Sequence, residues 1–353
     1  MTHGRIIDSD FRPPWWLRNP HLQTLWPKLL MQLRQRGGAS APPQTALERR
    51  RIELVDGDFI DLSIGIQRKG PRVLILHGLE GGLDSHYAGS LVDRLAADGF
   101  QPVFMHLRGA SGEPNRLARS YHSGASEDLR AVLEALAADP EGPPLAAIGF
   151  SLGGNLLLKY LGECWNEPGA GPGPEPGAKP GAKPGGGLGD PLLARAIAVS
   201  VPFVLRDAML RLELGFARIY RNYLVSRLKA AYRQKFARRP SPLAVDLDRI
   251  TDFNRFDDQI TAPLNGFAGV FEYYQRASCR GALRQIRTPT LIIHALDDPF
   301  MFPSTVPFEH ELGPGIRLEL ARHGGHVGFI AGHGAGYATD WLESRMLRAL
   351  HEG

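Results

Sequence analysis

The sequence predicts an α/β fold with a mostly parallel, doubly wound sheet, an antiparallel N-terminal edge and a helical cap. Three observations predict it: short continuous apolar runs typical of strands buried on both faces, amphipathic segments between those runs, and one long helical stretch that interrupts the alternation. The 353 residues, of which 43% are hydrophobic and 22% charged, have an ordinary globular composition and can enclose a large core. We therefore expect a single domain over residues 1–353.

The expected strands fall into two groups. Residues 49–67 predict a hairpin that forms the antiparallel edge, because apolar residues alternate on both sides of the turn signal Asp56-Gly57. From Arg72 onward the apolar runs become continuous, which is typical of parallel strands covered on both faces. The runs expected to form buried strands are 73–76, 102–105, 145–149, 194–201, 290–294 and 316–320.

Helices are predicted between these strands. Ser85 is a candidate N-cap for a helix that Gly99 closes, and Ser126 begins a second helix with acidic residues in its first turn. A third helix is expected from Leu152 to about Trp165, and a last one close to the C-terminus. The alternation of strands and helices favours a sheet with helices on both faces.

Three segments fall outside this alternation. Residues 1–45 form an aromatic-rich N-terminal extension, expected to pack over the core or shape a substrate pocket, with a membrane surface as the alternative. Residues 166–190 form a Gly/Pro tract with a tandem Gly-Ala-Lys-Pro at 177–184, which predicts a disordered surface loop. Residues 204–282 are helical and rich in Arg, Tyr and Phe, so we expect them to form an inserted cap.

Composition excludes several classes of protein. Lys and Arg number 41 against 37 Asp and Glu, a small imbalance spread along the chain that gives little support to nucleic-acid binding. The two cysteines, Cys164 and Cys279, indicate neither a disulfide framework nor a zinc site. No apolar run approaches the ~20 residues of a transmembrane helix, and residues 1–10 lack the hydrophobic core of a signal peptide. A cytoplasmic location fits best.

Ser151 is the candidate nucleophile. It lies in Gly149-Phe150-Ser151-Leu152-Gly153, which matches Gly-x-Ser-x-Gly at the junction of an apolar strand and a helix. A sharp turn at such a junction strains the serine backbone and projects its hydroxyl above the sheet. The position in the fold, more than the pattern itself, favours a nucleophile over a mere turn.

A serine hydroxyl needs a base beside it and an acid that orients that base. His326 follows the last expected strand in a glycine-rich loop and is the candidate base, with His323 as a nearby alternative. Asp297 and Asp298 follow the strand before it, and either carboxylate could reach the histidine. The resulting chain order of Ser151, Asp and His is the order expected for a nucleophile at a strand–helix turn of this kind.

Two backbone amides are candidates for stabilising the negative oxygen of an acyl-transfer intermediate. They are the Leu152 N–H, directly after the nucleophile, and the Leu79 N–H in His77-Gly78-Leu79-Glu80-Gly81, directly after the first parallel strand. We expect His77 to be structural. Asp84-Ser85-His86 contains the residue types of a triad, but consecutive side chains at a helix start diverge and cannot form a relay.

Several segments spread over almost the whole chain carry distinctive combinations of aromatic, Gly, Pro and polar residues. They are Phe11–Leu17, Asn19–Thr24, His77–Gly81, Arg108–Arg116, Tyr121–Gly124, Gly149–Asn155, Asp297–Phe300 and His323–Phe329. Together they resemble the YheT-like branch of the α/β hydrolases, which is related to the eukaryotic abhydrolase lipases and the plant embryogenesis-associated proteins.

The resemblance implies the α/β-hydrolase fold, a charge-relay system of Ser151, Asp298 and His326, and an esterase-like activity. It favours Asp298 over Asp297. The reaction expected from it is hydrolysis of a small-molecule carboxylic ester through an acyl-enzyme, with no metal and no organic cofactor. The alternatives are acyl transfer through the same intermediate and a non-catalytic scaffold that binds a membrane surface.

Overall fold

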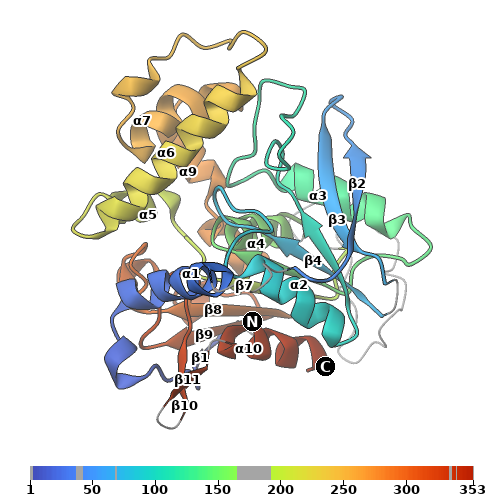
Figure 1. The fold of residues 1–353 in the computed structure, drawn as a ribbon, viewed down its shortest axis with the longest axis vertical. Helices are drawn as coiled ribbons and strands as arrows, with labels where there is room; N and C mark the ends of the chain where they lie inside the picture. Colours follow the sequence, from blue (N-terminus) through green and yellow to red (C-terminus); the bar gives the residue numbers. More distant parts are fainter. Residues whose placement is uncertain are drawn as a thin grey trace.

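The computed structural model describes residues 3–36, 43–67, 70–164, 192–333, 336–338 and 340–352. The Gly/Pro tract at 166–190 lies outside these ranges. Within them the chain forms a nine-stranded sheet in the order β1-β9-β8-β7-β6-β4-β5-β3-β2 (Figure 1). The strands are β1 (Arg5–Asp8), β2 (Leu47–Glu53), β3 (Phe59–Gly65), β4 (Arg72–Leu76), β5 (Gln101–Met105), β6 (Ala146–Phe150), β7 (Arg195–Val199), β8 (Thr290–Ala295) and β9 (Ile316–Ala321).

The sheet confirms the predicted fold class. Strands β4 to β9 run parallel to one another, whereas β2 and β3 form the predicted antiparallel hairpin, which joins the sheet through antiparallel pairing of β3 with β5. The six expected buried strands all appear, with ends that differ by at most two residues. Strand β1 was not predicted: its four residues are too few to display a pattern, and parallel pairing with β9, in which Arg5 lies opposite Arg317, defines it.

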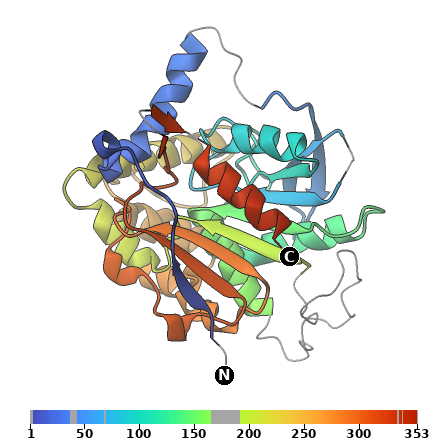
Figure 2. The ribbon, with the colours of Figure 1, turned by 90° about the horizontal axis from the view of Figure 1, so that it is seen from below.

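Helices cover both faces of the sheet, as Figures 1 and 2 show. Helices α2 (Ala88–Ala97) and α10 (Trp341–His351) pack on one face, and α3 (Ser126–Ala137) and α4 (Leu152–Cys164) pack on the other. The predicted N-cap at Ser85 is wrong. Helix α2 begins three residues later, because the Ser85 hydroxyl accepts a hydrogen bond from the N–H of Gly82 (3.1 Å) and so closes the preceding loop instead.

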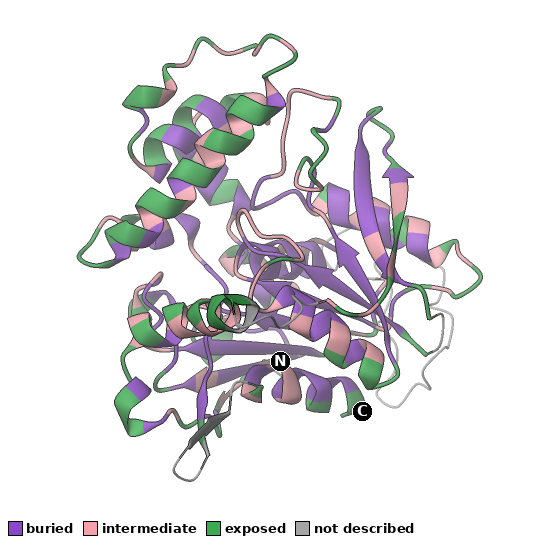
Figure 3. Ribbon diagram, in the orientation of Figure 1, coloured by how far each residue is buried: buried purple, intermediate pink, exposed green. Residues whose placement is uncertain are grey.

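The segment expected to be a cap is described throughout and contains no strand between residues 204 and 282. It has buried apolar clusters of its own. Figure 3 shows buried positions within its helices, among exposed ones. Its helices are α5 (Leu205–Leu212), α6 (Ala217–Lys235), η2 (Leu247–Arg249), α7 (Phe253–Phe256), the π-helical turn η3 (Asp257–Thr261), α8 (Ala262–Leu264), α9 (Val270–Ala277) and η4 (Arg280–Gln285).

The N-terminal region supplies η1 (Trp15–Leu17) and α1 (Pro20–Arg36), and α1 lies against the cap helix α6. Within the described residues, none of the helices combines the length and apolarity that a transmembrane span requires. The remaining short elements are η5 (Pro303–Thr305), η6 (Glu309–Glu311), β10 (Ala331–His333) and β11 (Gly336–Ala338).

Candidate active site

Ser151 lies in a tight turn between β6 and α4. Its φ of 50° is in the left-handed region, which a non-glycine residue occupies at a cost, and its N–H donates to the carbonyl of Val199 (2.8 Å). The turn needs glycine on both sides: a Cβ on Gly149 would lie 2.5 Å from the Gly153 oxygen, and one on Gly153 would lie 2.5 Å from the Leu76 oxygen. This close packing of α4 against the strands fixes Ser151 at the carboxyl end of β6, an interior strand of the sheet.

The structure brings the predicted Ser151, His326 and Asp298 together in one hydrogen-bonded series. The Ser151 Oγ lies 2.8 Å from His326 Nε2, and His326 Nδ1 lies 3.0 Å from Asp298 Oδ2. The Asp298 side chain is 1% exposed and that of His326 is 10% exposed. The other carboxylate oxygen of Asp298 accepts a hydrogen bond from the N–H of Phe300 (2.8 Å), which fixes the orientation of the acid.

Asp297 and His323, the two alternatives left open by residue type, pair with each other. Asp297 Oδ2 lies 3.1 Å from His323 Nδ1, and the side chains are 28% and 47% exposed. Burial raises the pKa of the Asp297 carboxyl, partly offset by the hydrogen bond to His323. Consecutive carboxylates therefore reach different histidines, and only the Asp298–His326 pair extends to Ser151.

Three further contacts hold the histidine loop, and none of them is predicted from residue type. The His326 N–H donates to Thr24 Oγ1 (2.9 Å), and the Val327 N–H donates to Ser200 Oγ (3.0 Å). The Phe300 ring stacks on the imidazole, with centroids 3.9 Å apart and planes inclined by 3°. Thr24 and Phe300 lie inside motifs noted in the sequence, which was the available signal, whereas Ser200 lies in none.

The two candidate oxyanion donors belong to segments that adjoin Ser151. Leu152 is the first residue of α4, so its N–H has no acceptor within the helix and carries the positive end of the helix dipole. A Cβ on Gly78 would lie 3.3 Å from the Ser151 Cβ, which places the loop bearing Leu79 directly against Ser151. This arrangement is compatible with both N–H groups pointing at one acyl oxygen.

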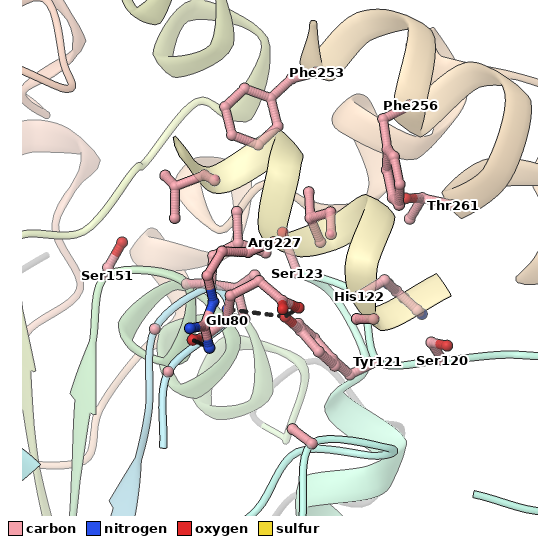
Figure 4. A pocket seen from close by; sticks show the side chains of 18 of the residues that line it. Glu80, Ser120, Tyr121, His122, Ser123, Ser151, Arg227, Phe253, Phe256 and Thr261 are labelled. Atoms are coloured by element: carbon pink, nitrogen blue, oxygen red, sulfur yellow. Dashed lines mark hydrogen bonds between the residues drawn. The ribbon is translucent and has the colours of Figure 1, made fainter. Parts of the chain in front are cut away.

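Hydrogen bonds with Tyr121 and Tyr87 hold the loop that carries Leu79. The Tyr121 hydroxyl accepts from the Glu80 N–H (3.0 Å) and donates to Glu80 Oε1 (2.8 Å), so it fixes both ends of a residue with φ of 53° (Figure 4). On the other side of Leu79, the Gly78 N–H donates to the Tyr87 hydroxyl (2.9 Å). The N–H groups of Gly78 and Glu80 thus have acceptors, whereas the Leu79 N–H has no acceptor among the residues that the structure describes.

His77 connects the same loop to the backbone of Leu107. The Leu107 N–H donates to His77 Nε2 (3.1 Å), so Nδ1 carries the proton and donates to the Gly78 carbonyl (2.7 Å). Burial lowers the pKa of His77 to about 4, which keeps the ring neutral at physiological pH. In the Asp84-Ser85-His86 segment, His86 Nε2 lies 3.5 Å from the Val327 carbonyl while Ser85 binds Gly82, so the two side chains have different partners.

Ser151 and His326 lie at the wall of a cavity of about 700 Å³, which is enclosed by loops at the carboxyl ends of the parallel strands, by α1 and by the cap. This volume is within the range of small-molecule ligand sites. Ser151, Leu79 and His326 line the cavity. The cap residues Phe253 and Phe256 lie across it from Ser151 in Figure 4. Most of the wall is aliphatic or aromatic, which suits an acyl chain.

Two buried charged groups lie at the cavity wall away from the relay. Burial raises the pKa of Asp257 to about 6, although its carboxylate accepts from Thr261 (2.7 Å) and Tyr274 (2.8 Å). Burial lowers the pKa of Lys235 to about 7, and its ammonium group donates to Asn115 Oδ1 (2.5 Å). Both groups have hydrogen-bond partners within the protein: Asp257 is held inside the cap, whereas Lys235 links the cap to Asn115 of the core.

Comparison with known proteins identifies the family. Residues 73–340 match the sequence model of the alpha/beta hydrolase family. The chain belongs to the α/β hydrolases. Its sequence is 40% identical to the Escherichia coli protein named "Putative esterase YheT". The alignment covers 96% of this chain and 92% of that relative. The chain is 28% identical to phospholipase ABHD3 of Mus musculus (94% and 76% covered) and 25% identical to embryogenesis-associated protein EMB8 of Picea glauca (99% and 74%).

Solved structures agree on the fold. The Pyrococcus furiosus esterase Pf2001 superimposes with a TM-score of 0.53 at 14% identity, covering 99% of this chain and 97% of that one. At this identity the likeness concerns architecture alone. The YheT-like resemblance and the α/β-hydrolase fold inferred from sequence motifs are both confirmed.

Proposed function

We propose that this α/β hydrolase cleaves carboxylic esters through an acyl-enzyme on Ser151. The observation that carries the proposal is the continuous Ser151–His326–Asp298 hydrogen-bonded series at the floor of a largely apolar cavity. A neutral imidazole that accepts from a serine and donates to a buried carboxylate is the arrangement that activates a hydroxyl for attack.

In the proposed mechanism, the Ser151 Oγ attacks the acyl carbon while its proton passes to His326 Nε2. Asp298 keeps the proton on Nδ1 and stabilises the imidazolium that forms. The N–H groups of Leu79 and Leu152 stabilise the oxyanion, each contributing about 10²–10³ in rate. His326 then protonates the leaving alcohol, and a water molecule, deprotonated by the same imidazole, releases the acid and restores Ser151. No step calls on a metal or an organic cofactor.

The apolar wall supports a substrate with a hydrocarbon acyl group. Two relatives are named phospholipase ABHD3 and monoacylglycerol lipase ABHD2. Lipid esters, the substrates in these names, carry acyl chains of the kind that an apolar cavity would bind. We therefore propose acyl esters of small alcohols or lipids as the substrate class. Transfer of the acyl group to an alcohol other than water uses the same intermediate.

A labelling and turnover experiment tests the proposal. Wild type should react with a fluorophosphonate probe and hydrolyse a chain-length series of p-nitrophenyl esters, and Ser151→Ala should lose both, with kcat falling by about 10⁴ or more. The control is Ser90→Ala in α2, whose hydroxyl donates to Glu343 of α10 (3.1 Å) outside the cavity lining and should be dispensable for both. Equal labelling of wild type and Ser151→Ala would remove Ser151 from the role. Diversion of most product from free acid to a new ester by added alcohol would make the enzyme an acyltransferase.

A further inference from the structure

Basic charge is concentrated on two adjacent helices. The whole chain has 41 Lys and Arg against 37 Asp and Glu, yet α1 and α6 contain no acidic residue. The two helices are in contact: His21 Nδ1 lies 3.1 Å from the Tyr220 hydroxyl, and the Lys28 ammonium donates to the Tyr223 hydroxyl (3.1 Å). Their basic residues are Lys28, Arg34 and Arg36 in α1, and Arg218, Arg221, Arg227, Lys229, Arg233 and Lys235 in α6.

Part of this charge is neutralised within the cap, since Arg221 pairs with Glu213 and Arg233 pairs with Asp248. Lys235 is buried. The exposed Arg218, in the first turn of α6, and Arg36, at the end of α1, lie outside these pairs. The surface around the α1–α6 contact therefore keeps an excess of positive charge.

The same two helices, together with the end of α5 and the connection that follows it, expose an apolar surface, which we call the mouth rim. On α1 its members follow one another at spacings of three, four and four residues, so they form a single stripe along the helix. On the cap they lie at the end of α5 and the start of α6. The mouth rim consists of Leu22, Leu25, Leu29 and Leu33 on α1 and Leu210, Leu214, Phe216, Ile219 and Tyr223 on the cap, all between 39% and 55% exposed.

The mouth rim borders the opening of the cavity above Ser151. Leu25 of α1 and Ile219 and Tyr223 of α6 line the cavity and are also among the exposed residues of the rim. Residues that face both the cavity and solvent mark the place where the cavity reaches the surface. Any substrate that enters between α1 and α6 passes this apolar border.

We propose that the mouth rim docks on the surface of a lipid bilayer that bears anionic headgroups, with the cavity opening toward the lipid. Contiguous exposed apolar patches on soluble domains mark interaction sites, and apolar stripes flanked by Lys and Arg suit the boundary between headgroups and acyl chains. Positive side chains near such a surface are attracted by anionic lipids. A second copy of this chain fits less well, because a two-fold interface would place the basic helices of both copies against each other.

Vesicle co-sedimentation of the full chain tests this docking. Ser151→Ala should pellet with vesicles of phosphatidylcholine and phosphatidylglycerol and much less with phosphatidylcholine alone, and added salt should weaken the binding. Use of Ser151→Ala prevents lipid turnover and separates docking from the proposed ester hydrolysis, which the soluble p-nitrophenyl esters report independently. Combining it with Leu29→Asp, Leu33→Asp and Leu214→Asp should weaken binding about tenfold or more, because each change removes an apolar side chain from the exposed face that is proposed to enter the lipid.

The matched control is Val55→Asp, at the fully exposed tip of the β2–β3 hairpin, which should bind vesicles like the parent. Arg218→Glu should weaken binding to the anionic vesicles without moving the thermal midpoint of unfolding. If the triple variant does not fold, Leu33→Asp alone, at a side chain already 52% exposed, supplies the apolar test. Absence of vesicle binding, equal binding to both lipid mixtures, equal loss with Val55→Asp, or a dimer in solution that the rim variants dissociate would overturn the proposal.

Discussion

Replacing Asp298 by Asn removes the carboxylate that accepts from His326 Nδ1 (3.0 Å) while preserving the size of the side chain. The Phe300 N–H holds the Oδ1 atom, so the new amide NH₂ group would face the imidazole and favour the tautomer with its proton on Nε2. That nitrogen could no longer accept the Ser151 proton. A wrong tautomer in a relay of this type costs about 10⁴ in kcat, which corresponds to about 5 kcal/mol of barrier.

The control for this prediction is the adjacent carboxylate. Asp297→Asn changes the same residue type one position away, but Asp297 pairs with His323 and should leave kcat/KM within about threefold of wild type, the range of ordinary surface substitutions. Both variants are compared in p-nitrophenyl ester hydrolysis and in the rate of fluorophosphonate labelling. If Asp297→Asn showed the loss predicted for Asp298→Asn while Asp298→Asn remained active, the assignment of Asp298 as the acid would be refuted.

Two other substitutions test the support of the relay and the acid sensitivity of the fold. Thr24→Val keeps the shape of Thr24 but leaves the His326 N–H without its acceptor, so kcat/KM for p-nitrophenyl esters should fall by about ten- to a hundredfold; unchanged kinetics would show that the loop does not depend on α1. Burial lowers the pKa of His294 from 6.5 to about 4. Between these two pH values the imidazole binds a proton in the unfolded chain but not in the folded one, so the free energy of unfolding falls as the pH falls from 6.5 toward 4. In urea unfolding, His294→Leu should gain about 2 kcal/mol relative to wild type between pH 7 and pH 5, whereas a difference independent of pH would contradict the neutral buried state of His294.

The sequence predicted the features that local pattern encodes. Continuous apolar runs mark strands such as β4 and β6 because both faces are covered, and the antiparallel hairpin has its own alternation and turn signal. Strand β1 has neither, since four residues at the sheet edge are defined by pairing with β9. Helix α2 was placed too early because a serine that closes a loop and a serine that caps a helix look the same in sequence.

The candidate site divides in the same way. Ser151 and His326 were located by residue type and position, whereas the choice between Asp297 and Asp298 rested on the family resemblance, because side-chain direction after a strand is a property of the folded loop. Thr24 lies far from His326 in the chain, and only the fold places its hydroxyl on the histidine N–H. The motif around Thr24 marks the segment as distinctive, but local pattern does not reveal which distant residue it contacts.

The most direct test of the central proposal is to trap the acyl group. Wild type is mixed with a p-nitrophenyl ester, quenched in acid within the first turnover, and examined by intact mass and peptide mapping. The proposal predicts a mass increase of one acyl group on the peptide that contains Ser151, and none in Ser151→Ala. An acyl group on another residue, or full ester hydrolysis by Ser151→Ala with no covalent adduct, would contradict it.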